Sequence, residues 1–160
     1  MIWRAAACGV MCAIGGCRAL PDAPTDMGPC GVALAVWVRN VAQAKYLYYT
    51  VEDGELAVGG GVDGLNRSTR WRMALDDAQC ARIAAIVRDS RWSASPPAPP
   101  EASAVRVDVS YRLPDGRGEL VTSDAEPGVS QLIAVLDELA AKRFEPALDR
   151  LPEAGPQKGR

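Results

Sequence analysis

Histidine is absent from this chain of 160 residues, and its absence excludes several kinds of chemistry. Histidine is the side chain that titrates near neutral pH and the commonest metal ligand in proteins. Nucleophilic catalysis by a Ser-His-Asp or Cys-His arrangement is therefore excluded. No other catalytic signature takes its place. We accordingly expect a protein that is not an enzyme and that holds no metal and no cofactor.

Positive charge is not in excess either. The chain has 18 Lys and Arg residues against 20 Asp and Glu residues, which gives a formal net charge of −2. A protein that binds nucleic acid presents a basic face, so we expect no nucleic-acid partner. The uncharged stretch 5–16 is shorter than the about 20 apolar residues that a permanent membrane-spanning helix needs.

The first sixteen residues have the order of a secretory signal. Arg4 and the amino terminus form a positive end, and small and apolar residues fill positions 5–16. The stretch ends in Ile14-Gly15-Gly16-Cys17. This sequence resembles the lipobox of bacterial lipoproteins, in which an aliphatic residue and two small residues precede the cysteine that is lipidated.

The resemblance implies that residues 1–16 are removed and that Cys17 becomes a lipid-modified N-terminus. It also implies a location in the bacterial cell envelope, anchored to the membrane by lipid and facing the periplasm. Arg18, in place of aspartate, favours the outer over the inner membrane by the sorting rule of enteric bacteria. The resemblance covers the leader alone. The alternatives are an N-terminal helix buried in a cytosolic protein and a start site assigned too far upstream.

Composition divides the rest of the chain. Residues 17–29 contain three prolines in a polar setting and are typical of a tether. Residues 30–150 are long enough for one domain with a core. Within it, the Pro-rich segment 93–104 is expected to be an extended loop. The tail 151–160 has no apolar run, so we expect it to be disordered.

Two of the five cysteines remain once Cys8 and Cys12 leave with the leader and Cys17 is lipidated. In an oxidising envelope this even remainder, Cys30 and Cys80, favours a disulfide. The alternative is that Cys80 is a small core residue, because it lies on the apolar stripe of an expected helix.

Alternating apolar residues predict strands, and apolar residues three and four apart predict helices. The strands are expected at 32–39, 45–51, 55–58, 70–75, 105–113 and 119–122, and the helices at 76–89 and 127–144. We therefore predict an α+β fold in two layers, an antiparallel sheet of four to six strands with two helices on one face. Asp53-Gly54 and Asp115-Gly116 are hairpin signals, and each hairpin leads to a helix. The similarity of the two halves indicates a tandem hairpin-plus-helix repeat. The alternative is that it arose by chance, since Asp-Gly turns are common.

The strand at 105–113 allows the sharpest prediction of burial. Strict alternation places Val107 and Val109 in the core and leaves Arg106 and Asp108 exposed. The helix at 127–144 has mixed charge on its outer side, unlike the Lys/Arg-rich face of a helix that lies on a membrane. We therefore expect that helix to pack on the sheet.

Aromatic residues give the candidate binding surface. Tyr46 and Tyr48 share one face of their strand, and Trp37 of the neighbouring strand is expected to join them. If that face is exposed, the rings form a surface for a protein partner. The alternative is that helices or the tether cover them.

A glycine-rich segment is the remaining motif. Residues 59–64 satisfy the pattern G-x-G-x-x-G, but residues 65–70 are polar and lack the helical periodicity that a dinucleotide site requires. We interpret this segment as a flexible loop.

Three hypotheses for function follow. The first is a lipid-anchored, non-enzymatic envelope protein that binds another protein or an envelope component. The second is a sensor of a small ligand, with residues 59–64 at the rim of its pocket. The third is a hydrolase that uses paired carboxylates.

Overall fold

The structure is a computed structural model and describes residues 27–90, 92 and 105–145. The predicted leader, Cys17, the tether up to residue 26, the Pro-rich segment 93–104 and the tail 151–160 lie outside the described residues. Among the described helices, none is long and apolar enough to cross a membrane.

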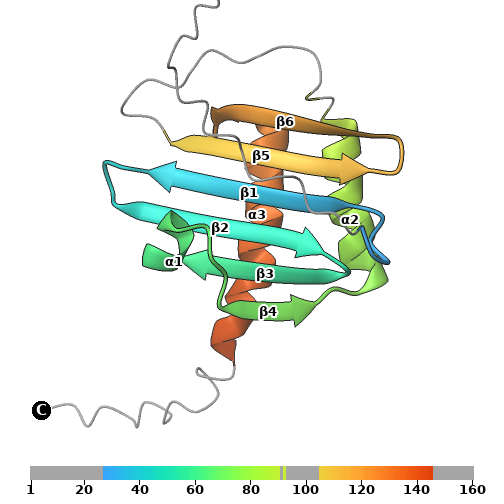
Figure 1. Cartoon of the computed structure of the whole chain (residues 1–160), viewed down its shortest axis with the longest axis horizontal. Helices are drawn as coiled ribbons and strands as arrows, with labels where there is room; N and C mark the ends of the chain where they lie inside the picture. The colour runs from blue at the N-terminus through green and yellow to red at the C-terminus, as the bar shows by residue number, and fades with distance from the viewer. Residues whose placement is uncertain (1–26, 91, 93–104, 146–160) are drawn as a thin grey trace, which may run out of the picture.

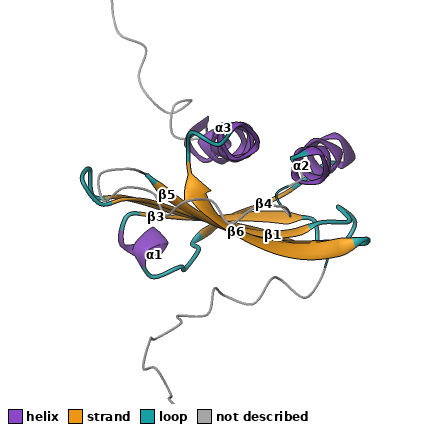
Figure 2. Ribbon diagram, turned by 90° about the horizontal axis from the view of Figure 1, so that it is seen from above, coloured by secondary structure: helices purple, strands orange, loops and turns teal. Residues whose placement is uncertain are grey.

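A six-stranded antiparallel sheet forms one layer, with strand order β4-β3-β2-β1-β5-β6 (Figure 1). The strands are β1 (Ala33–Asn40), β2 (Lys45–Glu52), β3 (Glu55–Gly60), β4 (Trp71–Ala74), β5 (Arg106–Leu113) and β6 (Gly116–Ser123). Two long helices, α2 (Asp77–Asp89) and α3 (Pro127–Ala141), cover one face, and the four-residue helix α1 (Val62–Leu65) lies on the other (Figure 2). A 3-10 turn, Lys142–Phe144, follows α3. The predicted two-layer α+β fold is therefore confirmed.

The two hairpin turns differ in their backbone. Between β2 and β3, Asp53 and Gly54 both have positive φ, 50° and 74°, as a two-residue hairpin turn often requires. Between β5 and β6, Leu113 pairs with Gly116, so the turn consists of Pro114 and Asp115. Proline fixes its φ at a negative value, so this second turn has a different geometry.

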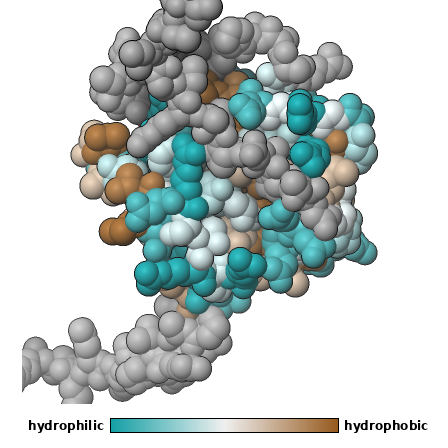
Figure 3. All heavy atoms as spheres, viewed as in Figure 1, coloured by the Kyte–Doolittle hydropathy of each residue, from teal (hydrophilic) through white to brown (hydrophobic). Residues whose placement is uncertain are grey.

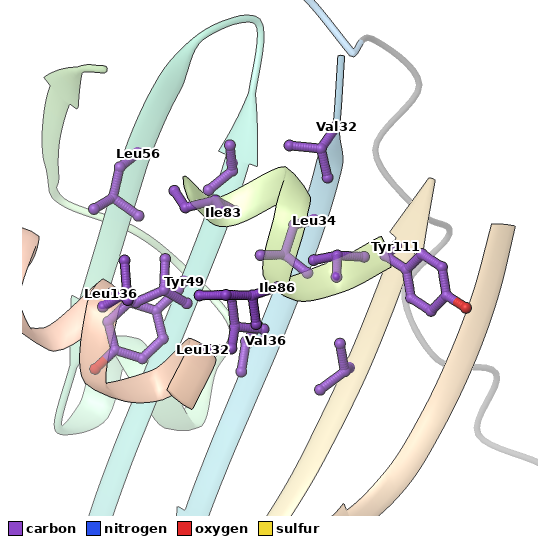
Figure 4. Close-up of a cluster of buried hydrophobic side chains, with 14 of the residues drawn as sticks. Val32, Leu34, Val36, Tyr49, Leu56, Ile83, Ile86, Tyr111, Leu132 and Leu136 are labelled. Atoms are coloured by element: carbon purple, nitrogen blue, oxygen red, sulfur yellow. The ribbon is translucent and has the colours of Figure 1, made fainter. Parts of the chain in front are cut away.

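The core lies between the sheet and the two long helices (Figure 4). Leu34, Val36 and Tyr49 of the two central strands meet Leu132 and Leu136 of α3 (Figure 4). The strands alternate as predicted, because one side chain in two points to the helices. Val107 and Val109 are fully buried, which confirms that part of the prediction for β5.

A capping box marks the start of helix α2, and a disulfide links this helix to the segment just before β1. Asp76 and Gln79 form a capping box at the start of α2. A disulfide links Cys30, just before β1, to Cys80 in α2, with Cα atoms 4.7 Å apart and a sequence separation of 50. By chain entropy, closing a loop of this length stabilises the fold by about 4 kcal/mol.

Candidate binding surface

The predicted aromatic surface lies on the face of the sheet opposite α2 and α3, which we call the open face. Register places Trp37 beside Tyr48 there, and Tyr46 is on the same side of β2. Of the two alternatives, covered rather than exposed rings are observed: Trp37 and Tyr48 are buried and Tyr46 is half-buried. Burial also raises the pKa of the Tyr48 hydroxyl.

Helix α1 is packed against this aromatic pair through backbone contacts. The Gly61 amide donates to the Tyr46 carbonyl at 2.9 Å, and the Trp37 indole Nε1–H donates to the Gly64 carbonyl at 2.7 Å. A Cβ atom on Gly64 would lie 2.5 Å from the Tyr46 carbonyl oxygen. The glycine motif therefore allows α1 to approach β2 closely, and the interpretation of residues 59–64 as a flexible loop is replaced by a packed segment.

Two guanidinium groups lie over the Trp37 ring. The Cζ atoms of Arg39 and Arg67 are each 3.9 Å from the ring centroid. Arg39 comes from the same strand and Arg67 from the segment after α1, where its φ is 54°. Both contacts have the distance of a cation–π interaction, which holds the two guanidinium groups over the indole.

Asp108 lies in the centre of this group, and the prediction that it is exposed is wrong. Its carboxylate accepts from Arg39 Nη2 at 2.8 Å and from Arg106 Nε at 2.9 Å, and its side chain is 3% exposed. It sits opposite Trp37 on the neighbouring strand. Alternation placed Asp108 on the correct face, but that face is occupied by arginine side chains and not by water. Arg106 is exposed, as expected.

We refer to Trp37, Arg39, Arg67, Arg106 and Asp108 as the Trp37 cluster. Burial lowers the pKa of the Arg39 guanidinium, an effect that the Asp108 charge opposes. Arg67 has no ion-pair partner among the described residues, whereas Arg39 and Arg106 share one carboxylate. The cluster therefore has more positive than negative charge.

Exposed aliphatic side chains border the cluster. Val62 and Leu65 of α1 are 72% and 46% exposed, and Val41 in the turn between β1 and β2 is 70% exposed. Figure 1 places α1 and this turn at the same end of the sheet, and Figure 3 shows apolar side chains gathered over that end. We call these three residues the apolar tip.

The hollows lined by described residues include the following two. One, of about 300 Å³, lies on the open face and is lined by Thr50, Glu52, Asp53, Glu55, Ala57 and Arg72. The other, of about 470 Å³, lies between the helices and includes Ile86, Ser90, Gly128 and Gln131. Among the described residues no cluster of acidic or cysteine side chains is suited to hold a metal ion.

No protein-family model matches the chain, and a search of curated proteins finds no match.

Sequence reasoning named Trp37 but missed the arginines around it. Arg39 continues the alternation of β1, so its position on the Trp37 face was readable from the sequence. The position of Arg67 could not be predicted from the sequence. Its side chain reaches the Trp37 ring from the segment after α1, and the path of that segment depends on the close approach of Gly64 to Tyr46.

Proposed function

We propose that this chain is a lipid-anchored, non-enzymatic protein of the bacterial cell envelope whose domain binds another protein. The partner binds at the apolar tip and the adjoining Trp37 cluster. The apolar tip is the observation that carries this proposal. Three of the four large hydrophobic side chains exposed among the described residues are gathered there, and the fourth is Phe144.

The composition of this surface supports a protein partner. Gathered exposed apolar side chains mark sites of interaction, whereas isolated ones need no explanation. Arginine and aromatic residues are enriched in protein interfaces, and here Arg67 and Trp37 adjoin the aliphatic residues. The contacts from Gly64 and Tyr46 hold α1 in place, so little ordering is needed on binding.

The other two hypotheses have less support. A ligand sensor was expected to use residues 59–64 as a pocket rim, but Gly61 and Gly64 pack against Tyr46 and Trp37, and these residues do not line the two hollows described above. A hydrolase needs two carboxylates that face one substrate. The carboxylates that line the open-face hollow belong to the exposed β2–β3 hairpin. One of them, Glu55, forms an ion pair in which its Oε2 atom lies 3.6 Å from Arg72 Nη1.

A pull-down from detergent-solubilised envelopes tests the binding surface. Leu65→Asp places a charge in the apolar tip without touching the core, so we expect the captured partner to be lost. Phe144→Asp is the matched control, since it makes the same kind of change at an exposed hydrophobic residue elsewhere. Equal capture by both variants would contradict the proposed surface.

Mass spectrometry of the native N-terminal peptide tests the lipid anchor. We expect a peptide that begins at Cys17 and carries lipid. Cys17→Ser should leave the protein uncleaved or soluble. An unmodified Met1 peptide recovered from cytosol free of envelope would contradict the anchor and leave the binding surface to be judged separately.

A further inference from the structure

We propose that the partner is a protein whose contacting segment is acidic, with a carboxylate that pairs with Arg67 beside aliphatic side chains that cover the apolar tip. This inference rests on the proposed function, because it concerns the same surface. It adds the chemical class of the partner.

The first support is the state of Arg67 compared with its neighbours. Arg39 and Arg106 both bind Asp108, and Arg70 binds Asp63 at 2.8 Å. Arg67 lies among them with no carboxylate partner in the described part of the chain. Its guanidinium is held over an indole, which leaves its donors available at the ring edge. A planar guanidinium fixed in this way matches the two oxygens of a carboxylate.

The second support is the local charge. The nearby carboxylates, Asp63 and Asp108, are both engaged in the ion pairs described above. Lys45, at the start of β2, adds an exposed positive charge at this end of the sheet. The chain as a whole has a net charge of −2, so the positive end is local. Such an arrangement favours an anionic partner and disfavours a cationic one.

The third support is the backbone of Arg67. Its φ of 54° lies in the left-handed region that favours glycine. A side chain kept at such a position is held there by the surrounding contacts, and such positions gather at binding sites. The contact with Trp37 is the described interaction that orients this side chain.

An anionic membrane is the competing source of negative charge, and the geometry favours a protein. Arg67 is half-buried with its guanidinium over the Trp37 ring, whereas Val41 and Val62 are largely exposed. A helix that lies on a membrane has a Lys/Arg-rich polar face with Trp, Phe or Leu opposite. Helix α1 has four residues, and its charged residue, Asp63, is acidic.

Defined peptides test the inference on the chain from Arg18, which keeps every residue of the described core. Three probes share the pattern acetyl-Val-X-Leu-X-Val-X-amide, with X as Glu, Gln or Lys. The readout is the NMR signal of the Trp37 indole N–H, assigned by its loss in Trp37→Phe. We expect the Glu peptide to shift this signal and to bind about tenfold more tightly than the Gln peptide, a factor worth one charge-assisted contact. Added salt should weaken the Glu peptide alone.

Variants at Arg67 separate charge from shape. Arg67→Gln should reduce binding of the Glu peptide to the level of the Gln peptide, and Arg67→Lys should restore part of it. Arg88→Gln, an exposed arginine of α2 on the opposite side of the sheet, is the matched control and should change nothing.

Each outcome has one meaning. Equal binding of the Glu and Gln peptides, or a Glu peptide insensitive to Arg67→Gln, overturns the acidic-partner inference. A shift of the Trp37 signal by phosphatidylglycerol vesicles but not by the Glu peptide assigns the surface to a membrane and also overturns it. If Leu65→Asp abolishes the envelope pull-down while the peptides fail, the proposed function stands and this inference alone fails.

Discussion

Asp108→Asn is the substitution that examines the Trp37 cluster most closely. Asparagine keeps the shape of the side chain but removes its charge. Its amide nitrogen would also face a guanidinium, so that one donor meets another. Both arginine contacts, at 2.8 and 2.9 Å, therefore change with a single atom replaced.

The exposure of the three partners sets the expected magnitude. Removing one partner of a fully buried ion pair costs about 3–5 kcal/mol. Here Asp108 is 3% exposed, but the side chains of Arg39 and Arg106 are 23% and 46% exposed. Water partly compensates these two charges, so we expect the free energy of unfolding to fall by about 1–3 kcal/mol.

Urea denaturation followed by circular dichroism measures this loss. Asp115→Asn, the same change in the exposed turn between β5 and β6, is the control and should stay within about 0.5 kcal/mol. The double variant Arg39→Gln/Asp108→Asn should cost less than the sum of its single changes, because the two residues share one interaction. If Asp108→Asn costs no more than Asp115→Asn, the buried ion pair is not stabilising and the reasoning fails.

Three further predictions concern the layers around the cluster. Leu136→Ala should destabilise the fold by about 2–5 kcal/mol in the same assay, because this side chain is fully buried between α3 and the sheet; an unchanged midpoint would mean that α3 does not pack there. Burial raises the pKa of the Tyr49 hydroxyl above its unfolded value of 10.0, and the 2.5 Å hydrogen bond that this hydroxyl donates to Asp137 acts in the same direction. The contribution of Tyr49 to the free energy of unfolding should therefore be complete below pH 10 and decline above it. Tyr49→Phe should remove that part of the decline in pH-dependent urea titrations, and an identical alkaline profile would refute the assignment. Gly64→Ala should displace α1 and shift the Trp37 indole signal, whereas Gly116→Ala, where a Cβ meets nothing within 4 Å, should not.

Much of the fold was predictable because each element has a simple pattern. Val107 and Val109 on β5, the capping box at Asp76 and the apolar stripe of α3 are local signals, and tertiary packing agrees with them. The margins of the apolar stripe of α3 were less predictable: Val135 is buried, whereas Ile133 is partly buried. These two residues lie on opposite margins of the stripe, so a small rotation of the helix about its axis decides which of them is buried.

The candidate surface was predictable only in part. The sequence placed Trp37, Tyr46 and Tyr48 on one face, but their cover comes from a four-residue helix too short to show periodicity. The burial of Asp108 depends on Arg39 of the neighbouring strand β1 and on Arg106, two residues away on β5 itself. The contact with Arg39 joins side chains that are distant in sequence, and such contacts have no signature in a single chain.

The orientation of Arg67 shows the same limit. Its left-handed backbone and its contact with Trp37 follow from how the segment after α1 folds back, which is fixed by contacts of Gly59 and Gly64. The glycines were noticed as a motif, yet their spacing does not tell a nucleotide loop from a close helix–strand approach. Only the three-dimensional arrangement distinguishes these two uses of glycine.

Photo-crosslinking in intact cells tests the central claim most directly. A benzoylphenylalanine placed at Leu65 in the apolar tip should form a crosslink to one protein, and Arg67→Glu should abolish it. The same probe at Ala81, exposed on α2, is the control and should give no such product. Crosslinks to phospholipid alone, or equal protein crosslinks from both positions, would contradict a protein-binding surface at the apolar tip.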